Sequence, residues 1–282
     1  MQSILSLWQA LPSHLSPEIF SVGGFEIRWY GIMYLAAFAC TYLLVRYRIK
    51  NEKEFKKYDT NFILDLFTWM ILGLLIGARF GYALFYNLSY FLENPLQIFL
   101  PFEMTEMGMI FTGISGMSYH GGAIGVLIAG LIFMKIKKAN FWNLADLVCP
   151  AIPLGYTFGR LGNFLNGELW GRATESSIGM YFQEGVLRHP SQLYEAFFEG
   201  IVLFAILWSL RRWLPQRFGR GSLLGFYLIG YGVFRFFIEY FREPDSHIGL
   251  IWEYFSMGQL LCMGMIILGG GLIFITKKHA KN

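Results

Sequence analysis

Seven long apolar segments run through this chain of 282 residues and limit what it can fold into. Apolar residues make up 55% of the chain and charged residues only 15%, whereas a soluble domain has about 25% charged residues. The chain therefore has too few polar groups to cover a water-facing surface. We predict an all-α integral membrane protein, a single domain over residues 1–282 with seven transmembrane helices. The expected spans are residues 29–45, 62–85, 118–134, 144–164, 193–210, 223–241 and 257–275.

The distribution of lysine and arginine predicts how these spans are oriented. Sixteen of the 23 cations, including every lysine, follow an odd-numbered span. Because cytoplasmic loops carry an excess of lysine and arginine, we expect a periplasmic N-terminus, a cytoplasmic C-terminus and small periplasmic loop elements. The cations form separate clusters rather than one water-facing stripe, which argues against a nucleic-acid partner.

The seven remaining cations are all arginines at the outer side of the spans or within them: Arg28, Arg79, Arg160, Arg172, Arg188, Arg235 and Arg242. An arginine at the centre of a span costs at least about 2.5–3.5 kcal/mol, so these residues need a partner or a function. Arg28 and Arg242 are either interfacial anchors or functional residues. Arg79 either pairs with Asp65 or Asp146 or has a functional role.

Arg160 lies in a polar block of fourteen residues, GRLGNFLNGELWGR, from Gly159 to Arg172. The block contains two asparagines, one glutamate, two arginines and four glycines. This composition disfavours a continuous helix. It favours a polar pocket, because glycine lets the backbone approach a ligand closely.

A second polar pattern lies in the sixth expected span, where Tyr231, Arg235 and Glu239 are spaced i, i+4, i+8. This spacing places the three side chains on one face of a helix. An internal Arg–Glu pair explains the pattern, and so does a phosphate site, because a guanidinium group binds phosphate through two hydrogen bonds. Glu195 and Glu199 enter the membrane in the fifth span and need cations, which the outer arginines can supply.

His120 is the histidine best placed for chemistry, at the outer end of the third span. An ordinary imidazole can take a proton at neutral pH, although a lone interfacial histidine can also be purely structural. No set of histidine, aspartate and glutamate residues has metal-ligand spacing. We therefore expect neither a metal nor another cofactor.

These motifs resemble those of the bacterial prolipoprotein diacylglyceryl transferases, inner-membrane enzymes of lipoprotein maturation. The resemblance covers nearly the whole chain, and the motifs occur in the family's order. The motifs are WYG at 29–31, HGG at 120–122, GRLGNFLNGELWG at 159–171, HPSQLYE at 189–195, YGVFRFFIEYFREPD at 231–245 and SMGQ at 256–259. The block that begins at residue 159 is the most specific of them.

The resemblance implies a seven-helix enzyme of the bacterial inner membrane with its active site facing the periplasm. Such an enzyme transfers the diacylglyceryl group of phosphatidylglycerol to the thiol of the lipobox cysteine in a prolipoprotein signal peptide. The products are a thioether and glycerol phosphate. Nothing in the sequence calls for a partner subunit, so we expect a monomer that contacts membrane lipids. The family's important positions fall here on Tyr30, His120, Arg160, Asn163, Glu168, Gly171, Glu195, Tyr231, Arg235 and Glu239.

The chemistry of the implied reaction suggests roles for these residues. The charge of the leaving phosphate grows in the transition state, so Arg160 and Arg235 are the expected clamp. The attacking thiol must become a thiolate; His120 is the expected base, and Tyr30 is the alternative base or only orients lipid or thiol.

The other family positions are expected to bind the lipid or to support the arginines. Asn163 is expected to hydrogen-bond the lipid headgroup, with Gly171 and Tyr231 in the same binding site. Three carboxylates, among them Glu168 of the catalytic set, are expected to hold the arginines in place. These carboxylates belong to Glu168, Glu195 and Glu239.

Three other classes of protein also fit part of the pattern. A transporter or flippase for an anionic lipid would use the same arginines as a binding site, but the chain has no internal repeat and an odd number of expected spans. A seven-span sensor would not need the dense polar block. A phosphatidyltransferase would need metal ligands. Transport predicts lipid movement without covalent change, whereas the enzyme predicts a thioether product.

Overall fold

The computed structural model describes residues 4–22, 25–100, 102–105, 108–111, 116–182, 185–243, 250–251 and 255–280. This described part is mostly helical and contains five segments long and apolar enough to cross a membrane: Trp29–Asn51, Thr60–Phe85, His120–Lys137, Ser191–Leu210 and Met257–His279. A further apolar helix, Ser222–Ile238, is shorter. The chain is therefore a multi-pass membrane protein, as its composition predicted.

The helices and strands belong to two compact units, residues 1–55 with 141–282 and residues 56–140. The first unit contains α1 (Ile4–Ala10), η1 (Leu11–His14), β1 (Glu18–Val22), β2 (Phe25–Arg28), α2 (Trp29–Asn51), η2 (Lys53–Phe55), α6 (Phe141–Val148), α7 (Ile152–Leu165), β5 (Met180–Tyr181), β6 (Leu187–Arg188), α8 (Ser191–Glu195), η4 (Ala196–Val202), α9 (Leu203–Leu210), α10 (Trp213–Phe218), α11 (Ser222–Ile238), β7 (Leu250–Ile251), β8 (Phe255–Ser256) and α12 (Met257–His279). The second contains α3 (Thr60–Phe85), α4 (Leu88–Glu93), η3 (Pro95–Ile98), β3 (Phe102–Thr105), β4 (Gly108–Phe111) and α5 (Tyr119–Lys137). Successive strands pair into two-stranded antiparallel hairpins.

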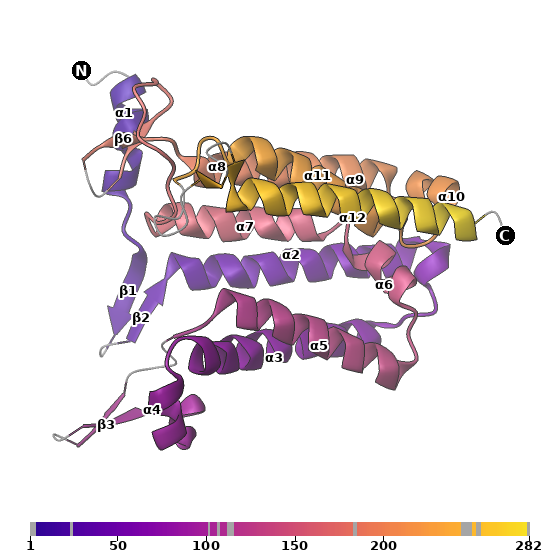
Figure 1. The fold of residues 1–282 in the computed structure, drawn as a ribbon, viewed down its shortest axis with the longest axis horizontal. Helices are drawn as coiled ribbons and strands as arrows, with labels where there is room; N and C mark the ends of the chain where they lie inside the picture. The colour runs from indigo at the N-terminus through magenta and orange to yellow at the C-terminus, as the bar shows by residue number, and fades with distance from the viewer. Residues whose placement is uncertain are drawn as a thin grey trace. The chain divides into compact units, whose positions relative to one another are not determined.

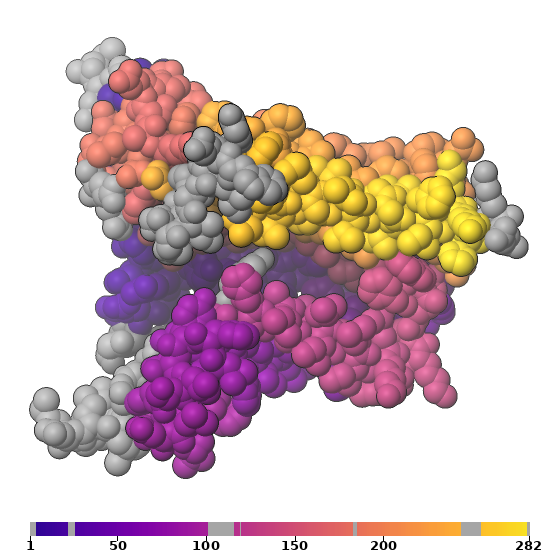
Figure 2. Space-filling model, viewed as in Figure 1, coloured from indigo at the N-terminus to yellow at the C-terminus, as the bar shows by residue number. Residues whose placement is uncertain are grey.

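The long helices of the first unit run side by side (Figure 1). Helix α2 packs on α7, α7 packs on η4, and α11 packs on α12. Four buried leucines from α9, α10 and α11 form a core cluster within this unit: Leu203, Leu207, Leu214 and Leu223. Helix α12 (yellow) lies open along much of its length on the face shown in Figure 2.

The segment predicted as one span over residues 144–164 forms two helices, α6 and α7, separated by residues 149–151. Pro150 and Pro153 explain the break, because proline lacks the N–H that an α-helix needs and clashes with the preceding turn. Pro153 is tolerated in the first turn of α7, where that N–H has no helical partner. Gly155 then lets α7 approach α2 closely, since an added Cβ would lie 2.6 Å from the Thr41 hydroxyl oxygen.

A buried charge network joins the C-terminal end of α2 to its neighbours. Arg48, only 1% exposed, pairs with Glu52 at 2.7 Å and donates hydrogen bonds to the carbonyl oxygens of Asp146 and Leu147. Glu52 also accepts a hydrogen bond from Arg211 at 2.8 Å. Burial raises the pKa of Glu52, but the hydrogen bonds and charges of Arg48 and Arg211 outweigh burial and hold this pKa below its usual range. Glu52 is therefore ionised at neutral pH.

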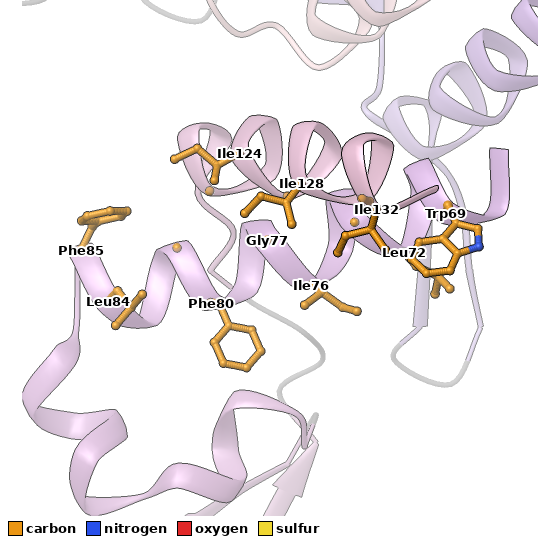
Figure 3. Close-up of a pocket in the computed structure, with 15 residues that line it drawn as sticks. Trp69, Leu72, Ile76, Gly77, Phe80, Leu84, Phe85, Ile124, Ile128 and Ile132 are labelled. Carbon is orange, nitrogen blue, oxygen red and sulfur yellow. The ribbon is translucent and has the colours of Figure 1, made fainter. Parts of the chain in front are cut away.

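The second unit is built on a close contact between α3 and α5. Glycines allow this contact: an added Cβ at Gly77 would lie 2.6 Å from Gly125 Cα, and one at Gly81 would lie 2.6 Å from Gly121 Cα. Small residues at this spacing are typical of helices that pack tightly in membranes. An apolar groove of about 560 Å³ lies along this pair of helices (Figure 3). Its lining includes Leu72, Ile76, Phe80, Leu84, Ile124, Ile128 and Ile132.

Candidate active site

Arg160 lies near the C-terminal end of α7, one turn after Tyr156 and one turn before Asn163. This spacing puts the three side chains on one helix face. Arg160 Nε donates a hydrogen bond to the Tyr156 hydroxyl at 2.7 Å, and Arg160 Nη1 donates one to Asn163 Oδ1 at 3.2 Å. The helix ends at Leu165, within the polar block that was predicted to disrupt it. Arg160 and Asn163 are therefore held on a helix and not in the loop that follows.

Glu195 is the point at which three arginines meet. Its side chain is 0% exposed. Glu195 Oε2 lies 2.8 Å from Arg160 Nε and 3.0 Å from Arg235 Nη1, and Oε1 lies 2.7 Å from Arg242 Nη1. A carboxylate buried this deeply is stable only when it is paired and hydrogen-bonded. The cations that the sequence requires for Glu195 are thus in contact with it.

A π-helical turn, η4, follows Glu195 and carries Glu199, whose side chain is also fully buried. The Tyr156 hydroxyl lies 2.6 Å from Glu199 Oε2 and 3.0 Å from Glu195 Oε2, so it can donate to either carboxylate. At Gly200 an added Cβ would overlap the hydroxyl oxygen of Thr157 on α7. Glycine at this position therefore lets η4 approach α7. Single π-helical turns are frequent at functional sites.

Of the predicted stripe of Tyr231, Arg235 and Glu239, the first two residues lie on α11 and Glu239 directly follows its last residue. The side chains of Arg235 and Glu239 pair at 3.2 Å (Nη2 to Oε2). The Ser256 hydroxyl, at the N-cap of α12, donates a hydrogen bond to Glu239 Oε1 at 3.0 Å. Gly258 leaves space for the carboxylate, since an added Cβ would lie 2.5 Å from Glu239 Oε1. The internal Arg–Glu pair is therefore present, and it belongs to a larger network.

Arg242, for which an interfacial anchor was one of two interpretations, belongs to that network. It lies 2.7 Å from Glu195 and 3.6 Å from Glu239 Oε2. Arg242 lies after the end of α11 at Ile238, so the helical spacing of the stripe does not extend to it. We refer to the six residues below as the arginine–glutamate cluster. Its members are Arg160, Arg235, Arg242, Glu195, Glu199 and Glu239.

Two other outer arginines have partners near the surface of the first unit. Arg28 pairs with Glu26 at 2.7 Å, and both side chains are exposed. The hydrogen bond and charge of Glu26 raise the pKa of Arg28. Arg188 pairs with Glu243, whose side chain is 54% exposed, at 3.0 Å. An exposed pair such as Arg28–Glu26 contributes little to stability.

Glu168, which was expected to hold an arginine, has different partners in the described part of the chain. Its Oε1 accepts hydrogen bonds from Asn163 Nδ2 at 2.7 Å and from Asn166 Nδ2 at 3.5 Å. Gln192, which is fully buried, donates a hydrogen bond to the Glu168 carbonyl oxygen at 2.6 Å. Glu168 therefore orients the amide of Asn163, whose Oδ1 in turn accepts a hydrogen bond from Arg160.

Tyr30 and Tyr231, which were predicted from the sequence as site residues, lie next to the residues that hold Arg160. Tyr30, at the start of α2, is close to Gly162, where an added Cβ would lie 3.3 Å from Tyr30 Cδ2. Its hydroxyl is 3.0 Å from the hydroxyl of Tyr34. The ring of Tyr231 packs edge-to-face on Tyr156, with 5.8 Å between ring centroids. Tyr30 and Tyr231 thus belong to the first unit, as the arginines do.

Gly171 lies between two backbone segments. Its N–H donates a hydrogen bond to the His189 carbonyl at 2.8 Å, and the Arg172 N–H donates one to the Phe241 carbonyl at 2.9 Å. An added Cβ at Gly171 would overlap the carbonyl oxygen of Phe241. Packing alone therefore explains why residue 171 is a glycine. Burial lowers the pKa of the neighbouring His189 imidazole, so this side chain is neutral at pH 7.

Replacing Gly171 with alanine should lower the free energy of unfolding by about 1–3 kcal/mol, because the methyl group overpacks a rigid site. The matched control is Gly159→Ala in α7, where an added Cβ meets no atom of the described chain within 4 Å. That control should be neutral or stabilise by about 0.5–1 kcal/mol. Thermal unfolding of both purified variants measures the difference. Equal melting temperatures would show that Gly171 is not constrained by packing.

His120 lies in the second unit, as the second residue of α5. Ser118 caps this helix by accepting a hydrogen bond from Gly121 N–H at 3.3 Å, and its own N–H donates to the Ala78 carbonyl at 2.9 Å. On α3, Arg79 donates hydrogen bonds to the carbonyls of Gln97, Ile98 and Gly116. Of the carboxylates considered for Arg79, Asp65 pairs with Lys137. Asp146 accepts hydrogen bonds from the N–H groups of residues 221 and 223.

The fold and this network define a multi-pass membrane protein with three partly buried arginines joined by one carboxylate. The model of a family described as prolipoprotein diacylglyceryl transferase matches residues 17–275. The chain therefore belongs to the prolipoprotein diacylglyceryl transferase family, which confirms the family inferred from the sequence motifs.

Several proteins named phosphatidylglycerol–prolipoprotein diacylglyceryl transferase are similar to the whole chain. The one from Chlorobaculum tepidum is 54% identical over 98% of this chain and 94% of its own length. Those from Idiomarina loihiensis and Pseudoalteromonas translucida are 45% and 44% identical over 94% of this chain and 94% of their own lengths.

Proposed function

We propose that this chain transfers the diacylglyceryl group of phosphatidylglycerol to the lipobox cysteine of a prolipoprotein signal peptide. Its family and the activity named for its relatives support this assignment. One observation supports the location of the site where the lipid phosphate binds: the buried carboxylate of Glu195 contacts Arg160, Arg235 and Arg242. Three guanidinium groups brought together in this way suit an anionic phosphate group.

Arg235 offers a hydrogen-bond donor to such a phosphate. Its Nη1 atom is buried and has no acceptor in hydrogen-bond geometry among the described residues, although Glu195 Oε2 is 3.0 Å away. A phosphate oxygen of the lipid would satisfy this donor. Arg160 supplies the second guanidinium group from α7.

The reaction breaks the bond between a glycerol carbon and a phosphate oxygen and forms a carbon–sulfur bond to the cysteine. The thiol proton passes to a base, and glycerol phosphate leaves with the electron pair of the broken bond. Negative charge therefore grows on the leaving oxygen, and fixed cations in a site with little water stabilise it. We assign this task to Arg160 and Arg235, held in position by Glu195 and Glu239.

The remaining predicted residues bind or orient the lipid headgroup. Asn163 presents its amide to the headgroup, and Glu168 fixes the orientation of that amide through the 2.7 Å hydrogen bond. Tyr231 lines the same side of α11 as Arg235. Gly171 contributes by keeping the loop after Glu168 close to α11, with no direct part in the chemistry.

His120 is our candidate for the base that takes the thiol proton, and Tyr30 is the alternative. Loss of a general base slows a reaction by about 10²–10⁴-fold. We expect His120→Asn to slow peptide modification by that factor and Tyr30→Phe to have a smaller effect. His14→Asn, at an exposed position on η1, is the control. A larger loss in Tyr30→Phe than in His120→Asn would assign proton transfer to Tyr30.

For the membrane topology we propose seven spans in the bacterial inner membrane, with α6 and α7 together forming the fourth. Helix α7 alone has 14 residues and is about 21 Å long, shorter than the bilayer core of about 30 Å. The lysine-bearing ends of the helices face the cytoplasm. The N-terminal end of α2 and the arginine–glutamate cluster then face the periplasm, where a monomer meets the prolipoprotein and membrane lipids.

Mass spectrometry of a synthetic lipobox peptide tests the proposed activity. The peptide is incubated with purified full-length protein and phosphatidylglycerol. We expect the cysteine to gain the mass of one diacylglyceryl group while glycerol phosphate is released. An unmodified peptide, with well-folded protein and lipid supplied, would contradict the proposal. Lipid movement in vesicles under the same conditions would then favour transport.

A further inference from the structure

A cavity with both polar and apolar lining residues lies in the first unit, beside the C-terminal end of α12 and far along that helix from Ser256. Its volume is about 550 Å³, and Arg220, Thr276 and His279 are among the residues that line it. Trp142 of α6 and Ile275 of α12 contribute apolar surface. No residue of the arginine–glutamate cluster lines this cavity.

The walls of this cavity are fixed by the turn between α10 and α11. Gly219 and Gly221 both have positive φ, +89° and +91°, which disfavours any other residue there. At Gly219 an added Cβ would overlap the carbonyl oxygen of Thr276, and at Gly221 it would overlap the ring of Trp142. Asp146 anchors the turn by accepting a hydrogen bond from Gly221 N–H at 2.7 Å. The backbone that forms this wall of the cavity is therefore fixed by close contacts and by a hydrogen bond.

Arg220 is the lining residue of this cavity that carries a positive charge; Arg217, Lys277 and Lys278 follow or precede lining residues in the sequence and do not line it. No aspartate or glutamate is among the lining residues. Arg220, Arg217 and Lys278 form no ion pair with any described residue. Lys277 lies over the ring of Phe218 at 5.6 Å. The cavity thus offers charge-assisted donors to an anion.

An apolar track leads away from the cavity along α12. Ile267, Leu268, Phe274 and Ile275 are 47–73% exposed and lie on one helix face at a spacing of seven residues. Gly271 lies between them, with open space where a side chain would be. Figure 2 shows α12 open along this part of the molecule. A free phosphate ion would make no contact with this apolar track, whereas the acyl chain of a lipid can lie along it.

We propose that this cavity binds the phosphate headgroup of an anionic phospholipid, separately from the donor lipid of the reaction. Arg220 and His279 donate hydrogen bonds to the phosphate, and one acyl chain follows Ile275 and Leu268 along α12. Basic pockets between helices at the cytoplasmic side of membrane proteins bind lipid headgroups in this way. Trp142 lines the same cavity, and tryptophan is favoured at the level of the lipid headgroups.

Native mass spectrometry of the full-length protein, titrated with phosphatidic acid, tests this proposal. The test variant is Arg220→Gln/His279→Gln. Two variants serve as controls. Lys135→Gln removes one cation from α5, and Arg235→Gln removes an arginine from the active site. We expect the double variant to lose one bound phosphatidic acid, with its dissociation constant raised at least about tenfold. Lys135→Gln and Arg235→Gln should keep this lipid, and the double variant should keep wild-type diacylglyceryl transfer.

Three results would overturn the proposal. Unchanged lipid binding in Arg220→Gln/His279→Gln would remove the site. An equal loss in Lys135→Gln would reduce it to unspecific charge attraction. Displacement of phosphatidic acid by inorganic phosphate alone would identify a free anion as the ligand.

A second measurement does not depend on the folding of any variant. Phosphatidic acid with a photoreactive acyl chain should cross-link the wild-type protein within residues 264–280. Absence of this cross-link would contradict the acyl track.

Discussion

Exchanging Arg235 for lysine is expected to lower the rate of diacylglyceryl transfer by about 10²–10³-fold, the effect of losing one donor to a developing negative charge. Lysine keeps the positive charge but loses the planar fork that binds phosphate through two hydrogen bonds. It also cannot reach Glu195 and Glu239 at the same time with the geometry of Arg235, whose Nη1 and Nη2 lie 3.0 Å and 3.2 Å from these carboxylates.

The loss in Arg235→Lys should fall mainly on kcat, because the phosphate charge grows between the ground state and the transition state. Arg212→Lys is the matched control, since Arg212 is 61% exposed and 4.0 Å from its nearest carboxylate, Glu52. It should turn over as wild type does. Wild-type turnover in Arg235→Lys would refute the phosphate clamp, and a change in KM alone would limit Arg235 to ground-state binding.

Replacing Glu195 with glutamine should destabilise the folded protein by about 3–5 kcal/mol, the usual effect of removing one partner from a buried ion pair. Arg160, Arg235 and Arg242 are only 15–18% exposed and would lose the carboxylate that all three contact, keeping only Glu199 and Glu239 of the cluster. The melting temperature in detergent should fall by about 6–20 °C. Transfer activity should also be lost, because the guanidinium groups would repel one another out of position.

Glu243→Gln is the control for this change, because it removes a carboxylate that is 54% exposed and whose ion pair within the described part of the chain is with Arg188. Its effect should stay within about 1 kcal/mol. If Glu195→Gln keeps both the melting temperature and the activity of the wild-type protein, the carboxylate does not hold the arginines together. If the melting temperature is retained and activity alone is lost, Glu195 positions the arginines without stabilising the fold.

Hydropathy and helical spacing predicted much of the fold and part of the site. Apolar segments of sufficient length identify membrane helices, because backbone groups in lipid must be paired within the helix. The pairing of Arg235 with Glu239 followed from spacing alone. The presence of Glu195 next to arginines followed from the cost of an unpaired buried charge. These features depend on local sequence and on simple electrostatics.

Other features depend on contacts between distant segments and could not be predicted in this way. Tyr156 gave no signal, because a tyrosine in an apolar helix is ordinary until Glu195 and Glu199 lie against it. The division of residues 144–164 into two helices was missed for a different reason: the average hydropathy of the segment does not show the effect of Pro150 and Pro153. Arg242 follows the last regular turn of α11, so its place in the cluster depends on the path of the chain after that helix.

The π-helical turn at Ala196–Val202 sets the rotational phase of Glu195 independently of the helix that follows. A π turn holds one more residue than an α turn, and one residue rotates a helix by about 100°. Without that extra residue, α9 could keep its leucines in the core only if Glu195 pointed away from Arg160. The apolar half of this span and its charged end can therefore change in sequence separately, provided that the extra residue between them is kept.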